Sequence, residues 1–169
     1  MDVVIGAGIS GLASARALKS RGHDVIVVEQ NREVGYPIRS TGGIAKYFVD
    51  KLNIPSPPEV IASEIRSVDI RDDYGHHASI SLDHTVGYVY DYPKFIKNMA
   101  TNIKVNTSER VMNIDYKNNI IRTDRDVYSL DKDDRMIVSS GPYALSLIPD
   151  VMREEYNVSD DDTIVGYEE

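Results

Sequence analysis

Three glycines near the amino terminus, Gly6, Gly8 and Gly11, form the pattern G-x-G-x-x-G. They follow the short β-branched run Val3–Ile5, which is typical of a buried strand in a parallel sheet. After them, residues 10–21 are good helix formers with apolar side chains near helical spacing, and Gly22 favours an end of that helix. A glycine pattern between a strand and a helix is typical of a turn that binds the phosphates of a dinucleotide.

Each glycine has a separate role in such a turn. Gly6 permits the tight turn, Gly8 lets the backbone approach a pyrophosphate, and Gly11 lets the helix pack close to the strand. The helix N-terminus supplies free N–H groups and the positive end of the helix dipole. We include Ala7 and Ser10, which lie in the same turn, in the predicted cofactor site. The alternative is a glycine-rich turn without a ligand.

A second predicted strand, residues 24–28, ends at Glu29. An acid about 20 residues beyond the glycines is expected at the ribose of a bound dinucleotide. Its carboxylate accepts hydrogen bonds from ribose hydroxyls and would repel a 2′-phosphate. Gln30, at the same strand end, is included in the predicted site.

The loop GYPIRSTGG, residues 35–43, follows this unit closely. If FAD lies extended over the sheet, Arg39 can pair with phosphate oxygens. Ser40, Thr41, Gly42 and Gly43 then offer hydroxyl and backbone donors along the ribityl chain and the ring edge. The alternative is a surface loop with a solvated arginine.

The remaining pattern predicts an α/β fold, a Rossmann-like FAD/NAD(P)-binding domain with a parallel sheet, a β-meander and a small antiparallel insertion. We expect one domain over residues 1–169, with part of a substrate domain inserted near residues 60–92. His76 and His77 are adjacent and lack a ligand constellation, so no metal site is predicted. The expected elements are helices at 45–52 and 92–100, antiparallel strands between 64 and 92, strands at 103–105 and 136–138, a meander at 111–116, 120–123 and 127–130, partly helical structure after 142, and the start of a strand at 164.

Composition excludes several classes of protein. The chain has 169 residues, a net charge of −8 and scattered basic residues, which argues against a nucleic-acid partner. It has no cysteine, so disulfides, thiolate metal sites and a cysteine nucleophile are excluded. No apolar run reaches the length of a membrane span. We expect a cytoplasmic location, with peripheral contact with a membrane left open.

Taken in order, five blocks resemble the N-terminal half of the geranylgeranyl reductase family, FAD-dependent enzymes with a fold like that of p-hydroxybenzoate hydroxylase. The blocks are VVIGAGISGLASARALKSRGHDVIVVEQ, EVGYPIRSTGGI, VGYVYDYPKF, RVMNIDYKNN and IVSSGPYA. The first block is shared by many FAD enzymes, whereas the second and third are more specific. The resemblance implies FAD as the cofactor and, as the activity, hydride transfer from reduced flavin to isoprenoid double bonds of lipid precursors.

The resemblance also implies roles for residues. Gly6, Gly8, Gly11 and Glu29 would hold the AMP part of FAD, while Arg39 and the loop of residues 40–43 would lie along the pyrophosphate, ribityl chain and flavin. By the same resemblance, the backbone at Val111 would touch adenine. Ser140 and Gly141, at a strand end, would close over the ADP moiety.

The chain departs from the family at several positions. Ser40 stands where the family usually has a cysteine, so the catalytic residue is unknown; Tyr92 replaces a usual arginine, and Ser140 a usual Asp or Thr. The family also continues for roughly as many residues again. Two alternatives therefore stay open: a non-catalytic module that binds FAD or another adenine nucleotide, and a different redox enzyme on the same fold. Because a parallel sheet needs both faces covered, we expect self-association or a second chain that completes the fold.

Overall fold

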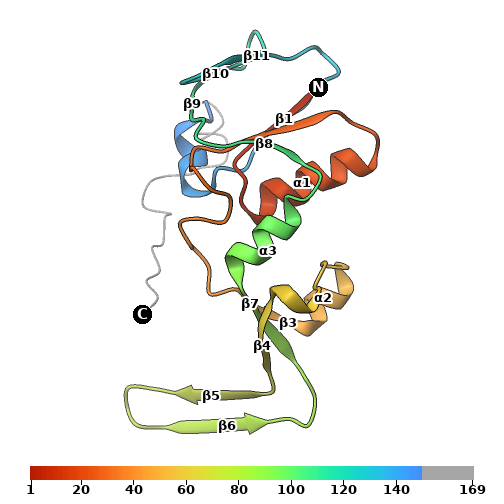
Figure 1. Cartoon of the computed structure of the whole chain (residues 1–169). Helices are drawn as coiled ribbons and strands as arrows, with labels where there is room; N and C mark the ends of the chain where they lie inside the picture. Colours follow the sequence, from red (N-terminus) through yellow and green to blue (C-terminus); the bar gives the residue numbers. More distant parts are fainter. Residues whose placement is uncertain (150–169) are drawn as a thin grey trace. The chain divides into compact units, whose positions relative to one another are not determined.

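A computed structural model describes residues 1–149 of the chain. These residues form two compact units, each described by itself below. Unit 1 contains Met1–Pro37 and the described residues from Met99 onward, and unit 2 contains Ile38–Asn98. Figure 1 shows the elements of both units in chain order.

A four-stranded parallel sheet forms the centre of unit 1. Its order is β12-β1-β2-β8, and each neighbouring pair is parallel. All residues of β1 and β2 are buried, which explains why β2, and β1 after Asp2, consist of β-branched residues. The strands are β1 (Asp2–Ile5), β2 (Val25–Val28), β8 (Lys104–Asn106) and β12 (Met136–Val138).

Helix α1 (Ile9–Ser20) connects β1 to β2 and packs on the sheet. It buries Leu12 and Ala15 completely, whereas its other side is exposed. The chain leaves the helix through Gly22, whose φ of +85° lies in the left-handed region that glycine favours.

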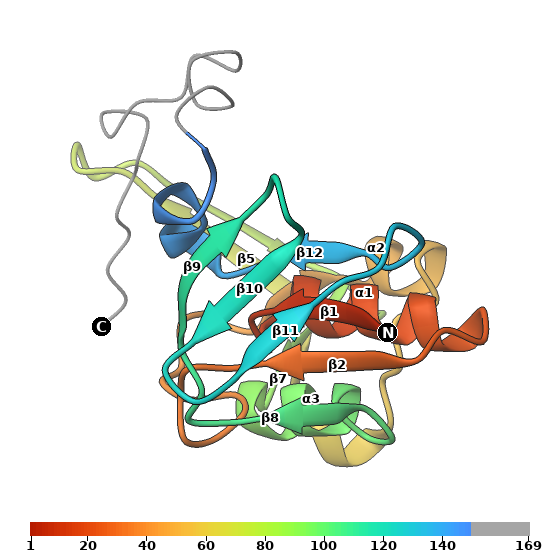
Figure 2. The same ribbon diagram turned by 90° about the horizontal axis from the view of Figure 1, so that it is seen from above.

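A three-stranded meander covers the other face of the parallel sheet, as Figure 2 shows. Side chains of β1 and β2 on this face join those of the meander in one apolar core, in which Ile121 is fully buried. The meander consists of β9 (Val111–Asp115), β10 (Ile120–Thr123) and β11 (Val127–Ser129), and the core residues are Val3, Ile5, Ile26, Val28, Ile114, Ile121 and Tyr128.

A buried polar network ties the meander to the connection between β8 and β9. The Tyr128 hydroxyl and the Thr123 hydroxyl both donate to Oε1 of Glu109, each at 2.8 Å, and Glu109 is only 4% exposed. Asn106 donates its side-chain N–H to the Tyr128 oxygen at 2.9 Å. Burial and the hydrogen bond to Glu109 raise the pKa of Tyr128 from 10.0 to about 12.

Unit 2 holds two small antiparallel sheets and two helices. One sheet has the order β3-β7-β4, and the other is the isolated hairpin β5-β6. In chain order the elements are β3 (Gly43–Ala45), α2 (Lys46–Lys51), the 3-10 turn η1 (Pro58–Val60), β4 (Ile61–Ile65), β5 (Ser67–Arg71), β6 (His77–Ser81), β7 (Gly87–Tyr90) and α3 (Tyr92–Met99).

The predicted fold class is confirmed, including the parallel sheet, the meander and the antiparallel piece. Two details differ from the prediction. The loop of residues 35–43 ends in a strand, β3, because Gly43–Ala45 pairs with β7. The antiparallel strands expected from residue 64 onward begin earlier, at Ile61, and the first two, β4 and β5, are separated by Arg66.

The carboxyl-terminal predictions are only partly within the described residues. After β12 the chain forms the 3-10 helix η2 (Gly141–Ser146). The helical parts expected beyond residue 149 and the strand expected at 164 lie outside the described residues. The assignment of residues 1–169 to one domain with an insertion near 60–92 stays a prediction.

Ile121→Ala should remove about 2–5 kcal/mol from the free energy of unfolding, because it leaves a cavity between meander and sheet. Urea denaturation measures this change. Arg122→Ala, on the neighbouring exposed position of β10, should change stability by no more than about 0.5 kcal/mol. Equal losses in the two variants would contradict the assigned core.

Alkaline pH should destabilise the protein partly through Tyr128. In the unfolded chain this phenol ionises near its ordinary pKa of 10.0, whereas in the folded protein its pKa is about 12. The stabilisation is therefore complete below pH 10 and is lost as the pH rises toward 12. Tyr128→Phe should make the decline in unfolding free energy across that window shallower than in wild type. An unchanged decline in urea titrations would refute this role of Tyr128.

Candidate functional site

Two of the three glycines after β1 are required by the fold itself. Gly6 has φ of +99°, and a Cβ there would lie 2.5 Å from the carbonyl oxygen of Ser139. A Cβ on Gly11 would lie 2.0 Å from the carbonyl oxygen of Gly6. These distances are shorter than any real contact, so only glycine lets α1, β1 and the end of β12 approach one another this closely.

Gly8 is different, because no contact within residues 1–149 requires a glycine there. Its φ is −75°, it is exposed, and a Cβ on it would meet nothing within 4 Å. It is the N-cap of α1, with no side-chain capping bond and no acid in the first turn. The helix therefore begins with unpaired N–H groups and the positive end of its dipole on an open surface. This arrangement suits the phosphates of a dinucleotide.

Glu29 is held against the same turn. It is 8% exposed, and its Oε2 accepts a hydrogen bond from the Ala7 N–H at 2.8 Å. Oε1 accepts from the backbone and side-chain N–H groups of Asn31, at 2.8 and 2.6 Å. Since each carboxylate oxygen accepts about two bonds, Oε2 keeps capacity for one more donor, such as a ribose hydroxyl. Sequence reasoning missed Asn31, although an amide two residues after the acid was a usable signal.

Ser140 lies beside Gly6 at the end of β12. A Cβ on Gly6 would be 3.2 Å from Cα of Ser140, and the Ser139 N–H donates to the Ile5 carbonyl at 2.8 Å. The Ser140 hydroxyl is buried and has no hydrogen-bond partner among residues 1–149. A buried hydroxyl without a partner is costly, so its place beside the turn fits a ligand that supplies an acceptor.

The start of β9 is tied to the end of β2. The N–H of Glu109 donates to the Glu29 carbonyl at 2.9 Å, and the N–H of Ser108 donates to the Asn31 carbonyl at 2.9 Å. Val111 begins β9 two residues later, so unit 1 gathers it near the strand end that carries Glu29 and the exposed Gln30. The predicted residues brought together in unit 1 are Gly6, Ala7, Gly8, Ser10, Gly11, Glu29, Gln30, Val111, Ser140 and Gly141.

The loop from Arg39 to Gly43 belongs to unit 2, where local structure explains part of its sequence. Gly42 has φ of +72°, and a Cβ on it would lie 2.6 Å from the Tyr90 carbonyl oxygen, so only glycine fits. The Ser40 hydroxyl oxygen accepts the Gly42 N–H at 3.1 Å, and that of Thr41 accepts the Gly43 N–H at 3.3 Å. Flavin contact by these residues remains a prediction.

Within residues 1–149, no three His, Cys, Asp or Glu side chains gather in a way that could hold a metal ion. In the same residues, no helix is long and apolar enough to cross a membrane.

Comparison with known proteins gives the family. The family described as FAD dependent oxidoreductase matches residues 3–100. A digeranylgeranylglycerophospholipid reductase of Methanothrix thermoacetophila is 32% identical over 101 residues, which cover 58% of this chain and 26% of that protein. The matched region thus spans about a quarter of the relative's length.

Solved structures agree on the fold. A geranylgeranyl bacteriochlorophyll reductase-like protein from Thermoplasma acidophilum has a TM-score of 0.69 at 23% identity, covering 83% of this chain and 39% of its own. CtdE, solved in complex with FAD and a substrate, has a TM-score of 0.61 at 18% identity, covering 82% of this chain and 37% of its own. FAD is the cofactor of this family, and the named relatives connect the chain to the geranylgeranyl reductases. Because the family match covers more than half of its residues, this chain belongs to the FAD-dependent oxidoreductases.

Proposed function

We propose that this chain binds FAD in unit 1 and is the nucleotide-binding part of an enzyme that reduces isoprenoid double bonds of lipid precursors. One observation carries the binding proposal. The N-terminus of α1 is open at Gly8, which the protein itself does not need as a glycine, and Glu29 is fixed against the same turn. An open set of amides and a buried ribose acceptor side by side suit a dinucleotide.

Each residue of unit 1 has a role in this proposal. The first-turn N–H groups of α1, with Ser10 among them, bind the pyrophosphate, and Gly8 leaves room for its approach. Glu29 accepts from a ribose hydroxyl through the free capacity of Oε2, and Ser140 donates its unpartnered hydroxyl to the ADP part. The Val111 backbone faces adenine. From unit 2, Arg39 and the loop of residues 40–43 would contact the pyrophosphate, ribityl chain and ring edge.

The chemistry would come from the cofactor, because bound reduced FAD supplies a hydride from N5. The choice of an isoprenoid substrate is supported by the name of the 32%-identical relative, a digeranylgeranylglycerophospholipid reductase. Since that match covers 26% of the relative, activity and substrate belong to this proposal. A cytoplasmic location with peripheral contact with a membrane fits an apolar substrate that resides in lipid.

A specific observation favours a second candidate, a FAD-binding module without catalysis. Ser40 stands where the related family usually has a cysteine, and a hydroxyl is a far poorer proton donor than a thiol. In this chain the Ser40 oxygen accepts the Gly42 N–H and so stabilises the local loop. Dithionite-reduced protein loaded with FAD separates the candidates: reoxidation of the flavin by a geranylgeranyl lipid supports the enzyme, and FAD retention without reoxidation supports the module.

Gly8→Glu should abolish FAD binding, because it adds bulk and negative charge where the pyrophosphate would approach. The fold should survive, since φ at this position suits any L-residue and the Cβ points into open space. The measurement is the flavin absorbance retained after incubation with FAD and desalting.

Ala17→Glu is the matched control for this experiment. It makes the same change in charge on the same helix, at an exposed position away from the N-terminus. Retention of FAD by Ala17→Glu and by wild type, but not by Gly8→Glu, is the expected result. Unchanged FAD affinity in Gly8→Glu would refute the proposed site.

Ser140→Ala should change the stability of the FAD-free protein and its affinity for FAD in opposite directions. Without FAD the variant should be as stable as wild type or more stable, because a buried hydroxyl without a partner is removed. With FAD the loss of one hydrogen bond should weaken affinity by about 0.5–1.5 kcal/mol, roughly two- to thirteenfold. Urea unfolding and fluorescence titration with FAD measure the two effects, and equal FAD affinity in variant and wild type would contradict the role of Ser140.

A further inference from the structure

The hairpin of unit 2 is a sheet of only two strands. β5 and β6 pair with each other from Ser67–Ser81 to Arg71–His77 and, within residues 1–149, with no other strand. All residues of both strands are exposed. A two-stranded hairpin of this kind is marginally stable in water, and a third or fourth strand stabilises it.

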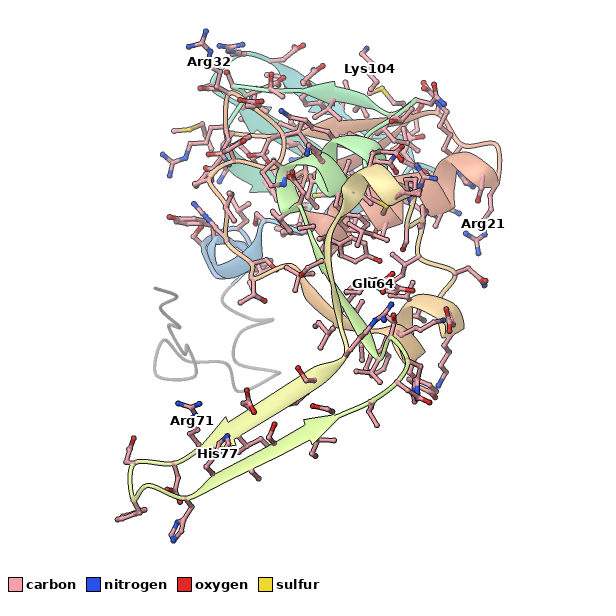
Figure 3. The ribbon with its side chains drawn as sticks, turned by 60° about the horizontal axis from the view of Figure 1, so that its bottom comes forward. Arg21, Arg32, Glu64, Arg71, His77 and Lys104 are labelled. Atoms are coloured by element: carbon pink, nitrogen blue, oxygen red, sulfur yellow. The ribbon has the colours of Figure 1, made fainter. Side chains whose placement is uncertain are left out.

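The two faces of the hairpin differ sharply in polarity. Residues directly opposite each other share a face, so Val68 and Ile80 lie together with Ile70 and Ala78. Val68 is 46%, Ile70 58% and Ile80 53% exposed. The opposite face is polar and includes Arg71 and His77, which Figure 3 labels on the hairpin. This face also has an ion pair between the Asp69 carboxylate and Nε2 of His77, at 3.5 Å.

The direction of each backbone group follows from the ladder. The Leu82 N–H donates to the carbonyl oxygen of Arg66 at 2.9 Å, and the Asp72 N–H donates to the carbonyl oxygen of His76 at 3.2 Å. Hydrogen-bonded pairs alternate with non-bonded pairs in an antiparallel ladder, so the pairs between these two ends, 68 with 80 and 70 with 78, are the bonded ones. The N–H and C=O groups of the residues between them therefore point outward: Ser67, Asp69 and Arg71 on β5, and His77, Ser79 and Ser81 on β6.

The two outer edges are not equivalent. The β5 edge carries charges at Asp69 and Arg71, and charged side chains discourage the addition of another strand. A two-fold pairing of β5 with itself about Asp69 would also place two carboxylates directly opposite each other. The β6 edge, His77-Ala78-Ser79-Ile80-Ser81, has no carboxylate, lysine, arginine or proline.

We propose that the outer edge of β6 is the interface between two copies of this chain, in which β6 pairs antiparallel with β6 of the second copy about a two-fold axis at Ser79. In this register Ser79 faces Ser79 of the copy, and His77 faces Ser81 of the copy. Ala78 faces Ile80 of the copy on the apolar face. No like charges of Lys, Arg, Asp or Glu are opposed, so the edge is complementary to itself.

The pairing gives the hairpin the additional strands and the hydrogen-bond partners that it lacks. Two hairpins form one four-stranded sheet in the order β5-β6-β6-β5, which meets the number of strands needed for independent stability. The outward groups of His77, Ser79 and Ser81 gain partners, and the charged β5 edges form the outer rims. The two-fold arrangement closes after two copies, whereas pairing of β6 with β5 of another copy would continue into an open fibre.

Sedimentation velocity of the whole chain over a range of concentrations tests this interface. Wild type should show a concentration-dependent dimer. Ser79→Pro removes the outward N–H at the two-fold axis from both copies, without removing a bond between β5 and β6. It should raise the dimer dissociation constant about tenfold or more. Ser67→Pro is the matched control, because it makes the same substitution at an outward N–H of the β5 edge, and it should dimerise like wild type.

Hydrogen exchange shows whether the hairpin itself survives in each variant. The amides of Val68 and Ile80, which bond across the hairpin, should be equally protected in both proline variants. In wild type, protection of the Ser79 amide should rise with protein concentration. A wild type that stays monomeric at every concentration, or equal weakening by Ser67→Pro and Ser79→Pro, would overturn the proposal. Both readouts are made without FAD, so their failure is distinct from a failure of FAD binding.

Discussion

The close approach of α1 to the end of β1 is the constraint on which the rest of unit 1 depends. A side chain at Gly11 would collide with the Gly6 carbonyl oxygen, and one at Gly6 would collide with Ser139. With both side chains absent, the helix N-terminus sits directly over the edge where β1, β2 and β12 end. Backbone amides that would otherwise be covered are then available at one place, together with the positive end of the helix dipole.

Two buried acids hold the chain around this edge. Glu29 binds the turn through Ala7 and its own strand end through Asn31, while Glu109 binds the meander through Thr123 and Tyr128. The backbones of the two acids are joined by a hydrogen bond, so the turn, the end of β2 and the meander form one connected structure. Such a frame keeps the Glu29 carboxylate and the first-turn amides of α1 in fixed relative positions. Under the proposed function, this limits the entropy lost when a nucleotide binds.

Unit 2 uses its glycines and hydroxyl side chains differently. Gly42 lets β3 approach β7, and the oxygens of Ser40 and Thr41 accept backbone N–H groups within their own loop. In unit 1, Gly6 and Gly11 are likewise required by the local fold, whereas no contact within residues 1–149 requires a glycine at Gly8. A glycine that the fold does not require is therefore the stronger sign of a ligand.

The sequence by itself determined the local elements and their class. The run Val3–Ile5, the glycine spacing and the position of Glu29 predicted the strand, turn, helix and strand of a dinucleotide-binding unit, because each depends on neighbours within about one turn or one strand. The meander could be predicted for the same reason. Only the tertiary structure decided that Ser140 lies beside Gly6, that Asn31 shares Glu29 with Ala7, and that Glu109 joins the meander to β2. Ser140 and Gly6 lie 134 positions apart, and Glu109 and Glu29 lie 80 apart. Such residues meet through sheet order and register, and packing rather than local pattern determines both.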